Sequence, residues 1–372
     1  MAQTTDSVST PRRFGYDVRG VAFFQDNEFP SPLMAGYSLP GFRLSAAAAY
    51  KPSRWVDIEA GVYLLQYWGA DAYPNQNYIG LPTFNDGNVS RGFHALPYFS
   101  AQVSTPWGLE VTLGSLRGEA SHGLIMPMFA PELSLTADPQ AGAEVRYQSR
   151  WIDADAWIDW RSFIFRDSPS EENFFVGASA KVKYTPDDAD VQVYSPVQLM
   201  IEHIGGEIDT IHSVQTYINA ALGVGARMRL RHPHLRWAGL EADMLYSHQQ
   251  KGTAWRHNRG TACWIVGTLQ ASKMRTQLGF YHASKFSPIL GYPLFGIASQ
   301  NKAGFILRNP STIYAGYEFE QRFGPGVTLS AFVDVYHLLG CDAFDPAVLA
   351  WGKQKATTSF DFGAKISIVL SR

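Results

Sequence analysis

The sequence lacks the long apolar run of a membrane-spanning helix. No stretch of its 372 residues approaches the roughly 18 consecutive apolar residues that such a helix requires. Charge is also scarce, at 17% of residues, whereas a soluble domain usually carries about 25%. This low charge indicates that part of the exterior is out of water. If that part faces lipid, the chain must cross as a closed β-barrel, because lipid leaves open sheet edges without hydrogen bonds.

The sequence also has few cysteines and a net charge close to zero. The two cysteines, Cys263 and Cys341, are too few for a disulfide framework and lack the spacing of metal ligands. We expect them not to be bonded to each other, because the strand pattern turns Cys263 outward and leaves Cys341 in a loop. A net charge of −2 gives no reason to expect nucleic acid as a partner. No nucleotide fingerprint is present, and no cofactor is expected.

The chain begins with Met1-Ala2-Gln3 and a polar stretch in which no signal peptide is recognisable. Either a signal has been removed or the numbering begins at the mature end. Residues 1–12 are predicted to be an N-terminal tail, and residues 13–372 a single barrel domain.

What the sequence does have is alternation. In the last run, 359–370, every second residue is apolar, and Asp361, Gly363 and Lys365 lie between them. Successive strand side chains point to opposite faces, so this run predicts a strand with one apolar and one polar face. Similar runs of ten to fourteen residues recur along the chain. A soluble β-sandwich also alternates, but its strands average about five or six residues.

The connections between runs alternate in length. Tight turns are expected at 51–54, 105–108, 149–150, 185–190, 232–234, 272–273 and 323–326. Longer loops are expected near 26–40, 68–92, 117–139, 167–172, 204–213, 249–259, 285–310 and 338–356. Seven turns and eight loops join sixteen strands, with short connections on one side of a membrane and long ones on the other. The first strand, with Asp17 and Arg19, is predicted to pair with the last, with Asp361 and Lys365.

Aromatic residues occur at both ends of the predicted strands. Trp55, Trp107 and Trp151 lie beside tight turns, whereas Trp68 and Tyr246 lie near long loops. Rings at both ends are typical of two lipid–water interfaces.

Over essentially its whole length the chain therefore resembles the porin-like outer-membrane barrels of Gram-negative bacteria. The resemblance implies an all-β fold, a transmembrane antiparallel up-and-down barrel of about sixteen strands with short inner turns and long outer loops. It also implies the outer membrane as location and membrane lipid as surroundings. One departure is the end of the chain, Ser371-Arg372, where such barrels often carry an aromatic residue.

The polar faces of the strands would line the interior. The charged residues predicted to line it are Asp17, Arg19, Asp57, Glu59, Asp153, Asp155, Asp159, Arg161, Lys181, Lys183, Arg227, Arg229, Glu318, Glu320, Asp361 and Lys365. Any one of them can simply pair with a neighbour. Together they require water, and sixteen strands are wide enough for an aqueous channel. Because acids outnumber bases, we expect a slight preference for cations.

Two of the long loops are unusually apolar. Their prominent residues are Met126, Met128, Phe129, Ile289, Leu290, Leu294 and Phe295. Such side chains are unfavourable in water, at ~25 cal/mol per Å² of apolar surface. The loops are expected either to pack on each other and narrow the barrel or to form a docking site for an outer-membrane partner protein.

Two function classes follow from these features. The first is a porin-like barrel giving restricted passage to small polar solutes. The alternative is a non-conducting barrel that acts as scaffold or subunit of an outer-membrane complex.

A third alternative is a lipid-facing hydrolase, because His282 and Ser284 share one strand face and Asn309 could orient the imidazole. Outer-membrane phospholipases are similar in using a lipid-facing His and Ser. We nevertheless predict no enzyme and no catalytic residue. His232 and His234 alone do not make a metal site, and no metal is expected.

Overall fold

The computed structural model describes residues 13–68, 93–162, 171–206 and 213–371. The predicted tail at 1–12 and parts of the predicted loops at 68–92, 167–172 and 204–213 lie outside these residues. No helix in the described ranges is long and apolar enough to span a membrane. Cys263 and Cys341 are free, as predicted.

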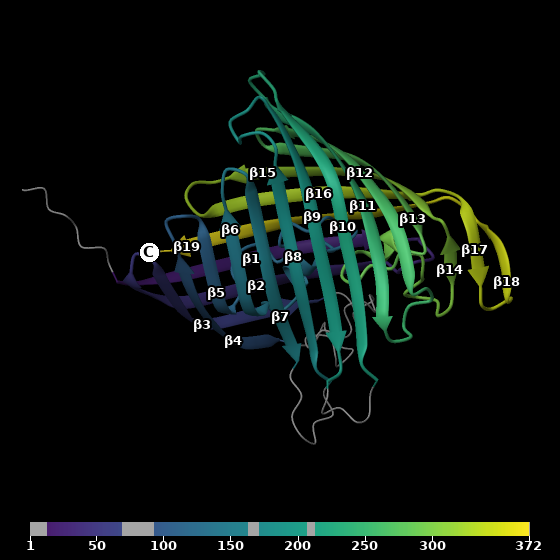
Figure 1. Ribbon diagram of the computed structural model, residues 1–372, viewed down its shortest axis with the longest axis horizontal. Coiled ribbons are helices and arrows are strands. Elements are labelled where there is room, and N and C mark those ends of the chain that lie inside the picture. The colour runs from purple at the N-terminus through teal and green to yellow at the C-terminus, as the bar shows by residue number, and fades with distance from the viewer. Residues whose placement is uncertain (1–12, 69–92, 163–170, 207–212, 372) are drawn as a thin grey trace, which may run out of the picture.

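Sixteen antiparallel strands form a closed barrel (Figure 1). In chain order they are β1 (Phe14–Glu28), β2 (Tyr37–Ser53), β3 (Val56–Tyr67), β4 (His94–Ser104), β5 (Leu109–Ser115), β6 (Ala141–Gln148), β7 (Ile152–Ser162), β8 (Asn173–Lys183), β9 (Val191–Ile204), β10 (Gln215–Arg229), β11 (Leu235–Lys251), β12 (Arg259–Ala271), β13 (Met274–Ser284), β15 (Ser311–Arg322), β16 (Val327–Leu338) and β19 (Thr357–Ser371). Each barrel strand pairs with the barrel strands that precede and follow it in the chain. Two of the outer connections contain additional short strands that are not part of the barrel. The predicted fold class and strand number are confirmed.

The barrel closes between β1 and β19, as predicted, but not through the charges that suggested it. In the register of this pair, Asp17 lies opposite Ser371 and Lys365 lies opposite Phe23. Asp17 instead forms an ion pair with Arg19 of its own strand, at 2.7 Å. The seam is therefore a ladder of backbone hydrogen bonds, which does not depend on matched side-chain charges.

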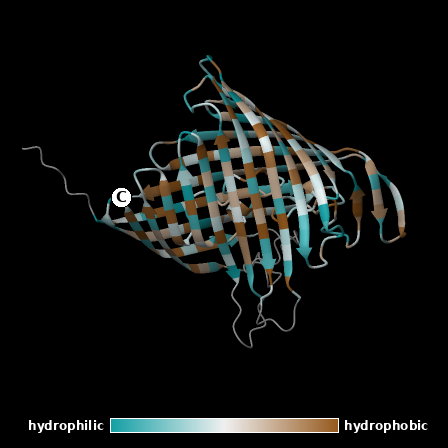
Figure 2. Ribbon diagram, viewed as in Figure 1, coloured by the Kyte–Doolittle hydropathy of each residue, from teal (hydrophilic) through white to brown (hydrophobic). Residues whose placement is uncertain are grey.

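The outer wall is apolar. Outward side chains such as Leu222, Val224 and Leu278 are more than 60% exposed in the isolated chain, and Figure 2 shows apolar and polar residues alternating along the strands. Rings such as Trp107 and Trp151 are exposed at the inner end, and Trp68 is exposed at the outer end. This is the surface that a bilayer would cover.

Two outer loops fold back into the barrel. Residues 116–140 include the short helix α2 (Leu133–Thr136), and residues 285–305 include the 3₁₀ turn η3 (Pro293–Phe295). They meet where Ala130 N donates to Leu290 O, at 2.9 Å. Phe295 packs edge-on against Tyr281, whose ring points inward from β13. The core that fills the barrel interior is thus built largely from these two outer loops.

Two buried amide side chains hold these loops to the wall in the same way. Gln198 of β9 accepts a hydrogen bond from Ile125 N and donates one to Gly123 O, both at 3.0 Å. Asn219 of β10 accepts from Ile289 N at 2.8 Å and donates to Ser287 O at 2.9 Å. Each amide satisfies an N–H and a C=O that would otherwise be buried without partners.

On another part of the wall the loops make further polar contacts. The Tyr37 hydroxyl of β2 donates to Glu132 of the first loop. Tyr292 of the second loop donates to Asp361 of β19, at 2.8 Å, and Gln25 of β1 also donates to Asp361. The loops are therefore bonded to the strands of the seam as well as to β9 and β10.

A small second sheet stands at the outer end of the barrel. It consists of β14 (Ile306–Arg308), β17 (Cys341–Asp345) and β18 (Ala350–Gln354), and projects at the right of Figure 1. Arg308 and Lys353 contact Asp342 across it. Cys341, expected in a loop, therefore lies on a short strand of this sheet.

The two faces of β13 yield a stability prediction. Leu278 points to lipid near the middle of the strand, whereas Gln277 points inward. We expect Leu278→Arg to lower the free energy of unfolding from vesicles by about 2–4 kcal/mol, because a charge near the bilayer midplane is poorly solvated. Gln277→Arg should have a much smaller effect in the same urea titration. Equal losses for the two variants would contradict the assignment of faces.

The amide contacts yield a second prediction. Asn219→Leu removes both partners of the 287–289 segment, so local opening there should become easier by about 1–3 kcal/mol. Hydrogen exchange of the Ile289 amide should accelerate accordingly. Gln277→Leu is the matched control, because its amide bonds Thr268 on a neighbouring strand and no loop. Unchanged exchange in Asn219→Leu would show that the loop is held by its apolar contacts alone.

Candidate functional site

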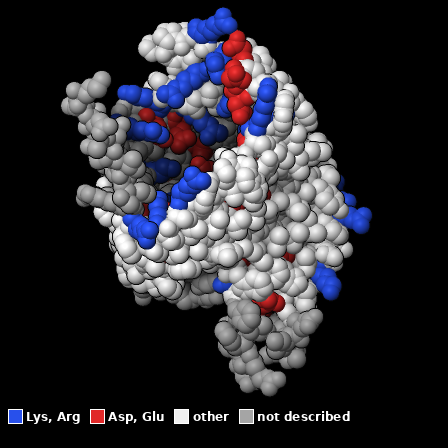
Figure 3. Space-filling model, turned by 60° about the vertical axis from the view of Figure 1, so that its left-hand side comes forward, with Lys and Arg blue, Asp and Glu red and all other residues white. Residues whose placement is uncertain are grey.

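The inner mouth of the barrel is hollow and charged. Figure 3 views the molecule from the side of the termini and shows acidic and basic side chains around this hollow. All sixteen charged residues predicted to line the interior lie on inward faces of their strands: Asp17, Arg19, Asp57, Glu59, Asp153, Asp155, Asp159, Arg161, Lys181, Lys183, Arg227, Arg229, Glu318, Glu320, Asp361 and Lys365.

Many of these charges pair. Arg161 contacts Asp159 at 2.6 Å, and Lys183 contacts Asp153 at 2.9 Å. Arg117 of the first inward loop contacts both Asp57, at 3.3 Å, and Glu59, at 3.4 Å. Arg117 could not be predicted to line the lumen, because nothing in a loop sequence shows that the loop enters the barrel.

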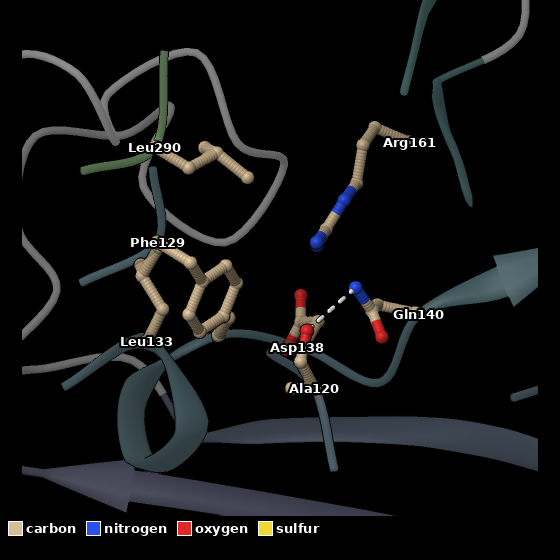
Figure 4. A pocket seen from close by; sticks show the side chains of 8 residues that line it. Ala120, Phe129, Leu133, Asp138, Gln140, Arg161 and Leu290 are labelled. Atoms are coloured by element: carbon tan, nitrogen blue, oxygen red, sulfur yellow. Dashed lines mark hydrogen bonds between the residues drawn. The ribbon is translucent and has the colours of Figure 1, made fainter. Parts of the chain in front are cut away.

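The outer half of the lumen is filled. The apolar loop residues predicted to cap the barrel lie inside it; Met128, Phe129, Ile289, Leu290, Leu294 and Phe295 are buried, and Met126 is partly buried against them. Between the loops is a small pocket (Figure 4). Its wall includes Phe129, Leu290 and the guanidinium of Arg161. Burial of these side chains favours a self-packed filling over a docking surface.

His122 fixes the first loop to the charged wall. Its Nδ1 lies 2.9 Å from Asp155 Oδ2 and 3.2 Å from Glu144 Oε1, and its ring stacks on Trp157 with centroids 3.8 Å apart. Burial lowers the pKa of His122, but hydrogen bonds to Asp155 and Glu144 and their charges outweigh it and raise the pKa to about 9. The ligand atoms of this cluster lie within 4.8 Å of one another, so it could hold a metal ion.

A second constellation faces lipid near the outer rim. His282 and Ser284 alternate with the buried residues Tyr281 and Ala283, so both point outward from β13. The serine within hydrogen-bond distance of His282 is not Ser284, however. Ser311 lies opposite His282 on β15, with its Oγ 2.8 Å from His282 Nδ1. A serine hydroxyl beside an imidazole is the minimal arrangement of an activated nucleophile.

The backbone is strained on both sides of this pair. Lys285 has φ +61° directly after β13, and Asn309 has φ +49° two residues before Ser311. Lys285 lies where the chain leaves β13 for the second inward loop, and Asn309 lies where the chain returns from β14 (Ile306–Arg308) to β15. Among the described residues no hydrogen bond links Asn309 to His282, so Asn309 is not its orienting partner here. Strained residues of this kind cluster at functional sites.

Other outward histidines near the outer rim bond threonine. His337 of β16 lies 2.9 Å from Thr358 Oγ1, and His203 of β9 lies 3.1 Å from Thr216 Oγ1. In the part of the chain that the structure describes, His282 is the one histidine hydrogen-bonded to a serine hydroxyl. This distinguishes the His282–Ser311 pair from the other polar groups of the rim.

Comparison with solved structures gives outer-membrane barrels. OpdK of Pseudomonas aeruginosa, solved with vanillate, aligns with a TM-score of 0.51 at 12% identity, over 96% of this chain and 99% of that chain. OccAB1 of Acinetobacter baumannii aligns with a TM-score of 0.50 at 10% identity, over 96% and 97%. At such identity the likeness shows the fold alone, and it confirms the resemblance to porin-like barrels.

Comparison with curated proteins gives no match. A family model described as lipid A 3'-O-deacylase-type matches residues 6–371. This match overturns the prediction that the chain is not an enzyme, because the family is an enzyme family. That prediction judged His282 with Ser284 and Asn309, whereas the serine that contacts His282 comes from another strand. Matched over nearly its whole length, the chain belongs to the lipid A 3'-O-deacylase-type family and lies in the outer membrane of a Gram-negative bacterium.

Proposed function

We propose that the protein hydrolyses an acyl ester of a lipid in the outer leaflet, with Ser311 as nucleophile and His282 as general base. The observation that carries this proposal is the 2.8 Å contact between Ser311 Oγ and His282 Nδ1 on the lipid-facing wall. The family name supports the reaction class, since it describes the removal of an acyl chain from lipid A.

The surroundings of the pair suit a lipid ester. Two residues further down the same strands, Phe280 and Ile313 point outward and are 40% and 46% exposed, and Ile265 of β12 lies beside Phe280. Acyl chains would lie against this apolar surface. The ester group of a lipid lies between its acyl chains and its headgroup. His282 and Ser311 lie at the corresponding depth, at the outer edge of this apolar surface.

The chemistry requires only the groups of the pair and water. As Ser311 Oγ attacks the ester carbonyl carbon, its proton moves to His282, and the imidazolium then protonates the departing sugar oxygen. Water, deprotonated by His282, releases the fatty acid from the acyl-serine.

The test is hydrolysis of outer-membrane lipopolysaccharide in vesicles, with the released fatty acid and the remaining lipid measured by mass spectrometry. Ser311→Ala and His282→Ala should each lower the rate by at least about 10²-fold. Ser284→Ala and His337→Gln are matched controls that should retain it. Retained activity in Ser311→Ala would place the nucleophile elsewhere, and loss in Ser284→Ala alone would assign it to Ser284.

A second function is supported by the charged hollow at the inner mouth. We propose that small polar solutes pass the barrel only slowly, because the inward loops fill its outer half. The acids of the lumen outnumber its bases, which favours cations. This property is compatible with catalysis on the outer wall, since the two use opposite faces of the strands.

Single-channel recording tests the permeation proposal. A variant lacking residues 286–297 should conduct several-fold more than the native chain in a planar bilayer, with some preference for cations. Removing residues 346–349, the tip between β17 and β18, should leave conductance unchanged. If the native protein already conducts like an open porin, the loops are not the constriction. If both variants and the native chain are silent, the barrel is closed by other residues.

A further inference from the structure

The cluster around His122 is more elaborate than an anchor for a loop requires. Three different parts of the chain supply it: His122 from the first inward loop, Glu144 from β6 and Asp155 from β7. The side chains of His122 and Glu144 are each only 1% exposed. No metal was expected from the sequence, where only the cysteines and His232 with His234 were considered as ligands. Residues 122, 144 and 155 have no spacing that resembles a ligand motif.

The Nε2 atom of His122, on the side of the ring away from the carboxylates, can act only as a hydrogen-bond donor. Gln140 Nε2 donates to Ala120 O at 3.2 Å, which turns its Oε1 toward His122 Nε2, at 2.9 Å (Figure 4 shows the Gln140–Ala120 bond). Since Oε1 is an acceptor only, Nε2 must carry a hydrogen. His122 Nδ1 is then the atom left to bind whatever lies between the two carboxylates. A second hydrogen bond of this kind is usual behind a metal-bound histidine.

The position of the ring is also fixed. Trp157 stacks on it with an interplanar angle of 8°, and the Ser179 hydroxyl donates to the carbonyl of His122. The backbone of His122 is held at φ +48°, a conformation rare outside glycine. Nδ1 is therefore presented to Glu144 and Asp155 without freedom to turn away.

Two oxygens of the cluster have no hydrogen-bond partner. Glu144 Oε2 and Asp155 Oδ1 are both buried, and neither makes a hydrogen bond within the described chain. Buried carboxylate oxygens are nearly always satisfied. Arg146 contacts Glu144 Oε1 at 2.6 Å and Asp155 Oδ2 at 3.5 Å, which are the other oxygens of the two carboxylates. Glu144 Oε2 and Asp155 Oδ1 therefore stay free to bind a cation.

We propose that His122 Nδ1, Glu144 and Asp155 bind a divalent transition-metal ion such as Zn²⁺. One imidazole nitrogen with two carboxylates is a ligand set suited to Zn²⁺ or Mn²⁺, whereas Ca²⁺ and Mg²⁺ prefer oxygen alone. The ion would join the first inward loop to β6 and β7. A proton on Nδ1 would compete with the ion for this position. It would also link His122 to the two carboxylates, but more weakly.

The experiment uses the whole folded barrel in detergent, stripped with a chelator and titrated with Zn²⁺ alone. Calorimetry and elemental analysis should give one ion per chain. His122→Gln and Glu144→Gln should each weaken binding by more than about 100-fold, and Gln140→Leu by about 10- to 100-fold, because it removes the support behind the imidazole. Heat-modifiable migration on gels reports whether each variant is folded.

His232 and His234 provide the matched control, because their rings lie 5.9 Å apart in an exposed turn and could bind Zn²⁺ adventitiously. His232→Gln should leave the tight site unchanged. Absence of a stoichiometric ion in the folded native chain would overturn the proposal and assign the position to a proton. Binding that survives His122→Gln and Glu144→Gln but is lost in His232→Gln would likewise overturn it.

Discussion

The structure depends on one constraint: no backbone hydrogen-bonding group can be left open toward lipid. A sheet satisfies this only by pairing its first strand with its last, here β1 with β19. Closure then requires every strand to have one face for lipid and one for the interior, which is the alternation seen from Phe14 to Ser371. The charge pairs once expected at the seam prove unnecessary, since Asp17 faces Ser371 and the ladder itself supplies the bonds.

Closing sixteen strands creates a second requirement, because the interior is too wide for wall side chains alone to fill. The chain meets it with its own outer loops, which carry Met128, Phe129, Leu290 and Phe295 into the lumen. Backbone brought inside must find partners too, and Gln198 and Asn219 provide them. At the inner end, where water enters, ion pairs such as Lys183–Asp153 line the wall instead.

Much of this could be predicted from sequence, because alternation is a local property. The strand number, the inward charges and the outward direction of Cys263 all follow from counting along one strand at a time. What could not be predicted depends on register between strands or on the path of a loop. Ser311 lies 29 positions from His282 and meets it only through the pairing of β13 with β15. His122 reaches Glu144 and Asp155 only because its loop turns inward, and no pattern in a loop shows that.

The contacts of the two inward loops also have a mechanical meaning. In the strand order of the barrel, β9 and β10 lie across from β1, β2 and β19. The loops are bonded to both groups of strands, through Gln198 and Asn219 on one side and Tyr37 and Asp361 on the other. They therefore act as struts across the diameter of the cylinder. Flattening the barrel, or parting it at the seam, would require these bonds to break together. The curvature of the wall that carries His282 and Ser311 is thereby braced from within, against the lateral pressure of the bilayer.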